Sequence, residues 1–402
     1  MKKTVAVLLA FALFLCAGCT QKSDVEAQIE ENAPPVYSKS SEKQEESSDH
    51  VPRDVVLSFL GCGDNMIYYG NVREAKYLAQ GTDKTYDFSP TYEHVAPLIS
   101  QADIAFINQE TLMCGGGYDL SYYPRFNSPQ EVGDTLQSVG FDVVNIANNH
   151  MLDKDEAGLA ATIAYWNSKK DVLLIGGYTD ESDSKTIRYL EKEGVRVAFL
   201  AYTTGTNGLT CADGAGAYVP YLSTSHISEV TEDIQRARQM ADVVIVSAHW
   251  GVENSFYPNE EQKTLAQAMA DAGADVILGH HPHVLQPIVW LTASDGHQTL
   301  CAYSLGNFVS EMSEDYQIVG GMLTFDIHVT NSGASIEQPQ FIPTVYHFNS
   351  SFYDNAVWLM KDYTSEMASI HGIRYYGNVA TLENLRGYVQ RTIDASFLPP
   401  EW

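Results

Sequence analysis

The sequence has little positive charge. Its 402 residues include 24 lysines and arginines against 51 aspartates and glutamates, which gives a formal net charge of −27. Nucleic acids and anionic membrane surfaces attract basic proteins, so the charge argues against both as electrostatic partners. The same acidity favours solubility and suits the binding of metal cations.

Cysteines are also few. Two of the six lie near the start of the chain, which leaves Cys62, Cys114, Cys211 and Cys301. Four cysteines allow three disulfide pairings, and the sequence does not choose among them. Cys62 and Cys114 both lie beside candidate metal-site residues, so they either neighbour each other or are each small buried hydrophobes.

Long apolar runs are absent after the first few residues. Met1–Lys3 is basic, Val5–Leu15 is a short apolar run, and Leu15–Cys19 resembles a bacterial lipobox. This order predicts a lipoprotein signal peptide over residues 1–19, with lipidation of Cys19. The protein would then be lipid-anchored on the extracytoplasmic face of the cell membrane.

An ordinary secretory signal, cut near Ala17 or Gly18, is the alternative. The apolar run is too short for a comfortable membrane span, and either reading takes the protein out of the cytosol. Residues 20–53 are polar and charged. We expect them to form a disordered tether, because such a segment cannot bury enough apolar surface to fold.

Apolar runs with strand character then alternate with helical patterns as far as Gly279, and no internal repeat is found. The expected strands are 55–60, 102–108, 141–146, 172–175, 195–202, 242–247 and 274–278. The expected helices are 92–99, 129–139, 158–167, 228–240 and 260–272. This order predicts an α/β domain over residues 54–350.

Beyond Gly279 the expected strands follow one another. Three antiparallel strands are expected at 299–303, 321–329 and 341–346, so the domain should have a β-rich end. A helix is expected over 382–395. We therefore predict a helical extension over residues 351–402 that packs on the domain.

Residues of the types that bind metals follow five of the expected strands. They are Asp64, Glu110, Asn148–His150, His249 and His280–His283. Ligands of open α/β sheets gather at the carboxyl ends of the strands, where carboxylate, amide and imidazole groups from separate strands can converge. Pro282 stiffens the turn between His281 and His283. The pattern predicts a two-metal site of the hydrolytic kind.

Six ordered motifs resemble the CapA family, which is associated with poly-γ-glutamate capsule synthesis and belongs to the calcineurin-like metallophosphoesterase superfamily. They are Gly63–Met66, Asn108–Glu110, Ala147–His150, His249–Glu253, Gly279–His283 and Tyr303–Phe308. The resemblance runs from about Val55 to Tyr346. It implies a sandwich of two mixed β-sheets flanked by helices.

The resemblance also implies roles for the site residues. Asp64 and His283 would bind one metal ion, with Glu110 as the bridging carboxylate. The second ion would be held by Asn149, His249 and His281. His150 would be the general acid for the leaving oxygen. The implied cofactors are two divalent ions, with Mn, Fe, Zn and Mg as candidates.

Other residues have less definite assignments. Asn148 and Glu253 are expected behind the ligands or facing the substrate, and Arg125 either meets an anionic substrate group or is a surface arginine. The superfamily usually has Asp-x-His at the first strand end, whereas Met66 stands two residues after Asp64 here. The first ion therefore lacks one imidazole. Either His280 replaces it or this ion is weakly held.

Two functions are compatible with the sequence. One is a lipid-anchored, metal-dependent hydrolase that acts on a phosphoester or an anionic polymer during capsule biosynthesis. The other is a non-catalytic subunit of a membrane complex for capsule synthesis or export, in contact with synthase subunits. The sequence leaves the substrate open.

Overall fold

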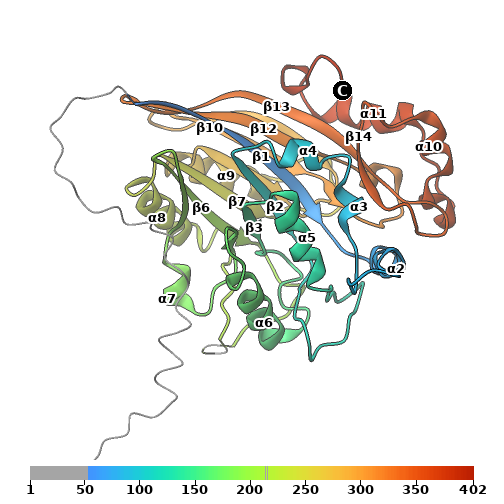
Figure 1. Ribbon diagram of the computed structural model, residues 1–402. Helices are drawn as coiled ribbons and strands as arrows, with labels where there is room; N and C mark the ends of the chain where they lie inside the picture. The colour runs from blue at the N-terminus through green and yellow to red at the C-terminus, as the bar shows by residue number, and fades with distance from the viewer. Residues whose placement is uncertain (1–52, 213, 215) are drawn as a thin grey trace, which may run out of the picture. The chain divides into compact units, whose positions relative to one another are not determined.

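Two mixed β-sheets with surrounding helices form the protein, as the computed structural model shows (Figure 1). The structure describes residues 53–402 except 213 and 215, and these residues fall within one compact unit. The predicted signal peptide with Cys19, and the predicted tether apart from Arg53, lie outside the described residues.

The first sheet has the strand order β14-β13-β12-β1-β2-β3-β4, and β11 also pairs with β1. Strands β1 to β4 run parallel, whereas β12, β13 and β14 are antiparallel to their neighbours. The bounds are β1 Asp54–Asn65, β2 Ile104–Gln109, β3 Val143–Asn145, β4 Leu173–Ile175, β11 Asn307–Val309, β12 Val319–Thr330, β13 Gly333–His347 and β14 Ala356–Leu359.

The second sheet has the order β5-β6-β7-β8-β10-β9. Its four inner strands are parallel, and the edge strands β5 and β9 pair antiparallel with them. The bounds are β5 Arg188–Lys192, β6 Val195–Thr203, β7 Val243–His249, β8 Val276–His280, β9 Leu285–Thr292 and β10 Gln298–Leu305.

The helices lie between and after these strands. They are α2 Tyr69–Leu78, α3 Ser89–Tyr92, α4 Ala96–Ile99, α5 Glu131–Val139, α6 Asp155–Asn167, α7 Glu181–Ser184, α8 Ile227–Arg238, α9 Glu260–Asp271, α10 Ser365–Ile370 and α11 Leu382–Thr392. Local chemistry sets several ends: Asn259 and Gln262 form a capping box at the start of α9. Within the described residues, none of these helices has the length and apolar character that a membrane crossing requires.

Alternating side chains of the inner strands pack on opposite sides of the second sheet. In β7, Val243 and Ile245 join the core shared with the first sheet, while Val244 and Val246 pack in the cluster that includes residues of α8 and α9. Successive side chains of a strand point to opposite faces, so a strand covered on both sides is apolar throughout. The expected sandwich of two mixed sheets flanked by helices is confirmed.

Some local predictions were wrong. The helix expected at 92–99 is not continuous: α3 ends at Tyr92, residues 93–95 form a turn, and α4 begins at Ala96. Helix α2 was missed because its sequence is largely polar, and β14 was missed because it is only four residues long. Strand β14 pairs with β13, so the segment 351–402 contributes a strand as well as helices.

Cys62 and Cys114 do not form a disulfide with each other. Both are buried free thiols, and Cys301 is a third. Burial raises the pKa of each of these three thiols, so they are protonated, small apolar groups.

Candidate metal centre

The carboxyl ends of parallel strands from both sheets meet at one place. Strands β1, β2 and β3 of the first sheet end there, as do β7 and β8 of the second. Two glycines allow the backbones to approach closely: a Cβ added to Gly63 would lie 2.0 Å from the Gly306 carbonyl oxygen, and one on Gly279 would lie 2.0 Å from that of Tyr303. Larger residues would push the ends of β1 and β8 away from β10 and from Gly306, which follows it.

Asp64 is fully buried and surrounded by donors. Asn108 Nδ2 donates to Asp64 Oδ1 at 2.8 Å, and the His281 backbone N–H donates to Oδ2 at 3.2 Å. His280 Nδ1 lies 3.2 Å from Oδ1, and His283 Nδ1 lies 3.2 Å from Oδ2. Burial acts to raise the pKa of Asp64, but the two imidazoles outweigh it and hold the pKa well below its usual range.

Glu110 contrasts with Asp64, because neither of its buried carboxylate oxygens has a hydrogen-bond partner. Its Oε1 lies 3.6 Å from His249 Nε2 and 3.7 Å from His283 Nε2. Burial raises the pKa of Glu110 well above its usual range. Buried unpaired carboxylates are costly, so an unsatisfied one among imidazoles points to a bound cation.

Two groups of side chains can each converge on one ion. One group is Glu110, His281 and His283, and the other is Asp64, Glu110 and His249. Within each group the possible ligand atoms lie within 4.8 Å of one another. Carboxylate and imidazole are suitable donors for divalent metals, so the residues fit the expected cofactor. Glu110 is common to both groups, as a bridging carboxylate would be, whereas the histidines divide between them differently from the expected ligand sets.

The three histidines of these two groups differ in the direction of their pKa shifts. Burial lowers the pKa of His249 well below its usual range and that of His281 to about 4. Burial also acts to lower the pKa of His283, but Glu110 and Asp64 outweigh it and raise the value to about 9. Neutral imidazoles are the form that binds metals.

The loop that carries His281 and His283 is strained. Both residues have positive φ angles, 96° and 56°, which non-glycine residues seldom adopt. Asn307 secures the loop, since its Oδ1 lies 3.0 Å from His283 Nδ1 and its Nδ2 donates to the His283 carbonyl at 3.3 Å. Strain held by surrounding contacts is common at functional sites.

Asn149 belongs to the same cluster, because its Oδ1 lies 2.9 Å from His249 Nε2. Asn148 has a different role. Its Oδ1 accepts from the His150 backbone N–H at 2.9 Å, and its Nδ2 donates to the Gln109 carbonyl at 3.0 Å. Asn148 therefore fastens the loop after β3 to the end of β2.

His150 lies beside the cluster with one nitrogen already engaged. Its Nδ1 is 2.8 Å from Asp153 Oδ2, and both residues are buried. The rings of Phe126 and His150 are perpendicular, with their centroids 4.8 Å apart. A carboxylate on Nδ1 fixes the tautomer and leaves Nε2 as the nitrogen that can transfer a proton.

The remaining expected residues are spread more widely. His280 is buried against Asp64 but outside both ligand groups, and Met66 is buried after β1. Glu253 is exposed, and its charge acts on Glu110: burial is the main cause that raises the pKa of Glu110, and the charge of Glu253 adds to it. Arg125 is exposed, and its side chain makes no hydrogen bond or ion pair with the described residues.

Four residues around the centre had no assigned role in the sequence analysis. They are Tyr68, Asn108, Asp153 and Asn307. The three-residue spacing from His150 to Asp153 was an available signal, because such neighbours meet within a turn. Asn108 could have been found from its place one strand away from Asp64. Nothing in the sequence brings Asn307 to His283.

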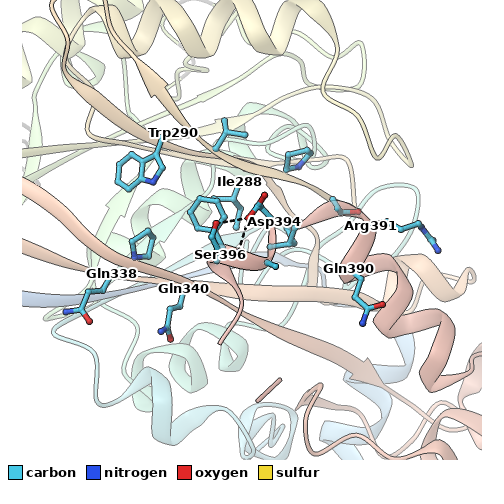
Figure 2. Close-up of a pocket in the computed structure, with 15 residues that line it drawn as sticks. Ile288, Trp290, Gln338, Gln340, Gln390, Arg391, Asp394 and Ser396 are labelled. Carbon is cyan, nitrogen blue, oxygen red and sulfur yellow. Dashed lines mark hydrogen bonds between the residues drawn. The ribbon is translucent and has the colours of Figure 1, made fainter. Parts of the chain in front are cut away.

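A separate cavity of about 1100 Å³ lies away from these residues (Figure 2). It is lined by residues of β9, β13 and the C-terminal segment, among them Trp290, Gln338, Gln340, Gln390 and Arg391. Figure 2 shows Gln338 and Gln340 below Trp290, Gln390 on the other side of the view, and Asp394 hydrogen-bonded to Ser396. None of the expected metal ligands lines this cavity.

Fold and site together define a two-sheet α/β protein with candidate divalent-metal ligands at the carboxyl ends of its parallel strands. The family model described as bacterial capsule synthesis protein PGA_cap matches residues 58–312, more than half of the chain. The protein therefore belongs to this family of CapA-like capsule synthesis proteins.

Two curated relatives have CapA names. The PGA biosynthesis protein CapA of Bacillus subtilis (strain 168) is 33% identical over 265 residues, which span 64% of each chain. The capsule biosynthesis protein CapA of Bacillus anthracis is 31% identical over 254 residues, 61% of this chain and 59% of the relative. The matches thus span less than two thirds of these relatives.

A solved 5'-nucleotidase precursor from Thermus thermophilus is similar at a TM-score of 0.42 and 11% identity. The match covers 84% of this chain and 59% of the nucleotidase. A likeness of this degree carries no information about the activity of the present protein.

Proposed function

We propose that this protein is a metal-dependent hydrolase of capsule polymer biosynthesis, in poly-γ-glutamate or another capsule. The observation that carries the proposal is the buried Glu110 carboxylate, which has no hydrogen-bond partner and is shared by two groups of metal-ligand side chains. The bond hydrolysed is proposed to be a phosphoester or a linkage of the anionic polymer.

In this proposal two divalent ions, drawn from Mn, Fe, Zn and Mg, are held by Asp64, Glu110, Asn149, His249, His281 and His283. The chemistry that such ions supply is activation of water and stabilisation of charge on oxygen. The protein supplies the rest. Asp153 orients His150, and His150 Nε2 gives a proton to the leaving oxygen.

We also propose that Cys19 carries the lipid that holds the protein on the extracytoplasmic face of the membrane. Cys19→Ala should abolish lipid labelling and release the protein from the membrane fraction or leave it unprocessed. Normal processing and membrane attachment of this variant would show that the lipoprotein proposal is wrong.

The test of the hydrolase uses the full chain purified in detergent. After growth with manganese, iron and zinc, the parent should contain divalent metal by elemental analysis and cleave a generic phosphodiester such as bis(p-nitrophenyl) phosphate. His249→Ala with His281→Ala should lose metal and activity, whereas the control His328→Ala, at a half-buried position away from the cluster, should keep both. A parent that contains no metal would contradict the proposal.

Met66 favours a second candidate, a non-catalytic subunit of a capsule synthesis or export complex in contact with synthase subunits. The imidazole that the superfamily pattern places two residues after Asp64 is missing, which weakens one ion site. His150→Asn separates the two candidates in cells. Capsule formation lost with unchanged protein and metal levels favours the hydrolase, and normal capsule formation favours the subunit.

A further inference from the structure

The loop after β6 contacts two of the proposed metal ligands. The Thr204 backbone N–H donates to the His249 carbonyl at 2.9 Å, and the Thr204 hydroxyl donates to the same oxygen at 3.3 Å. Three residues further on, Asn207 Oδ1 accepts a hydrogen bond from Asn149 Nδ2 at 3.3 Å. One short segment of this loop therefore contacts both the strand end that carries His249 and the side chain of Asn149.

Local sequence explains the shape of the loop at Asn207. Asn207 and Gly208 have φ angles of 53° and 76°, and the Leu209 N–H donates to the Thr206 carbonyl at 2.9 Å. Positive φ at both central residues together with this hydrogen bond is the pattern of a type I′ turn, in which Asn-Gly is a preferred pair. The Thr206 hydroxyl also donates to the Leu209 carbonyl at 2.6 Å. The turn is thus closed by bonds that do not involve the Asn207 side chain.

The Asn149 amide is held on both sides. Its Oδ1 lies 2.9 Å from His249 Nε2, and its Nδ2 donates to Asn207. Among the described residues, Asn149 Nδ2 has no acceptor other than Asn207 Oδ1. Asn149 is only 5% exposed, whereas Asn207 is exposed. The buried amide therefore lies between an acceptor in the loop and an imidazole at the end of β7.

The two ends of an asparagine amide differ in chemistry. The carbonyl oxygen is an acceptor and can bind a metal ion, whereas the NH₂ group is only a donor. Rotation about the last side-chain bond exchanges the two ends with little change in shape, because this torsion has a broad and roughly two-fold profile. Burial alone therefore does not select which end of Asn149 faces His249.

We propose that Asn207 is a positioning residue, which keeps the carbonyl oxygen of Asn149 turned toward the metal ion. Its Oδ1 engages Asn149 Nδ2, so the Asn149 oxygen stays on the side of His249. The reverse orientation would set the two amide oxygens against each other. This inference rests on the metal centre of the proposed function, in which Asn149 and His249 hold one ion.

The alternative is that Asn207 serves only the turn, since asparagine tolerates a positive φ. Two substitutions separate these roles. Asn207→Gly keeps the turn, because glycine adopts a positive φ at no steric cost, but it removes the acceptor. Asn207→Asp also suits the turn, and an ionised carboxylate has only acceptor oxygens, so it can still engage Asn149 Nδ2.

Calorimetric metal titration of the full chain in detergent, after treatment with a chelator, tests the proposal. The probes are Mn²⁺ and Zn²⁺. Asn207→Gly should weaken the binding of one equivalent by about 10–100-fold, the usual effect of losing a group that orients a ligand. Asn207→Asp should bind at least as tightly as the parent. Both variants should melt like the parent in the absence of metal, because the turn is preserved.

Thr210→Asp is the control for charge. It adds a carboxylate at an exposed position of the same loop without removing the Asn207 side chain, so it should bind metal like the parent. Binding in Asn207→Asp that is as weak as in Asn207→Gly would overturn the proposal, because an acceptor at this position would then not suffice.

A double-mutant cycle with Asn149→Ala isolates the orienting effect. In the Asn149→Ala background, Asn207→Gly should cause no further loss of affinity, since the amide that Asn207 orients is gone. An equal loss in both backgrounds, or equal affinity of Asn207→Gly and the parent, would overturn the positioning role and leave the hydrolase proposal intact. A parent that binds neither metal would overturn both proposals.

Discussion

His150 Nδ1 lies 2.8 Å from Asp153 Oδ2, with both side chains buried at the edge of the metal-ligand cluster. Asp153 also accepts from the Phe126 backbone N–H at 2.6 Å, which fixes the carboxylate in place. The pair thus has the arrangement of a proton donor and its orienting group.

Asp153→Asn should lower phosphodiester turnover because the amide no longer fixes the reactive tautomer of His150. His150→Ala should cost about 10²–10⁴ in kcat, the usual contribution of a general acid. The kcat of Asp153→Asn should lie between the values of His150→Ala and the parent. Steady-state kinetics on matched metal-loaded samples measure both.

The metal content of these two variants is the control. Both should retain the metal stoichiometry of the parent, since neither residue belongs to the candidate ligand groups. Parent-like turnover in His150→Ala would show that His150 is not the general acid. Loss of metal in this variant would indicate that His150 is a metal ligand instead.

Glu110→Gln should abolish stabilisation by metal. A ligand that binds only the folded state stabilises it, by about 2.7 kcal/mol at about 100 times Kd. The melting temperature of the parent should therefore rise on addition of Mn²⁺ or Zn²⁺ after treatment with a chelator. That of Glu110→Gln should not, because the shared carboxylate is gone.

The control His328→Gln should respond to metal like the parent, since the half-buried His328 pairs with Asp54 and Glu337 away from the cluster. An equal rise in Glu110→Gln and in the parent would mean that metal binds elsewhere.

Asn108→Ala should weaken both the fold and the metal centre. Asn108 Nδ2 donates to Asp64 at 2.8 Å and its Oδ1 accepts from Asn145 Nδ2 at 2.8 Å, so the amide links three neighbouring strands. Leaving buried polar partners unsatisfied costs about 1–3 kcal/mol in the free energy of unfolding. Groups that orient ligands change metal affinity by about 10–100-fold.

Asn145→Ala is the comparison for Asn108→Ala. It breaks the same ladder without removing the hydrogen bond to Asp64, so it should lower stability with less effect on metal affinity. Denaturant unfolding and metal titration measure the two effects, and identical metal affinities in both variants would contradict the orienting role.

The protein should lose stability in acid through His371 and His347. His371 Nε2 donates to the Tyr346 carbonyl and Nδ1 accepts from the Ile373 N–H, so the folded state requires the neutral ring. Burial lowers the pKa of His371 to about 3 and that of His347 to about 4, the latter despite an opposing effect of Asp354.

Since both folded-state pKa values lie below the unfolded value of about 6.5, the unfolded chain binds more protons between these limits. The contribution of these two residues to stability is thus fully present above about pH 6.5. It falls as the pH drops toward the folded-state pKa values, by up to about 1.4 kcal/mol per pH unit for each residue. In His371→Gln the free energy of unfolding should fall less steeply over this range, and an unchanged slope would contradict the assignment.

Much of the fold could be predicted from local patterns in the sequence. The spacing of apolar residues and the residues that flank each apolar segment are local properties. The strand ending before Glu110 and the strand ending at His249 were both predicted, and both candidate ligands lie at the carboxyl ends of these strands. Helix α2 and strand β14 escaped, since a polar helix and a four-residue strand have no distinctive period and form through tertiary packing.

The sequence by itself determined two things. It placed residues of metal-ligand types after the strands, and it indicated a two-sheet α/β fold of the CapA family. Only the tertiary structure decided their surroundings. It left the Glu110 oxygens unpaired, set Asn307 against His283, and brought Asn207 to Asn149. The reason is physical: residue type and period are encoded locally, whereas strand register and contacts between distant segments depend on how the whole chain packs.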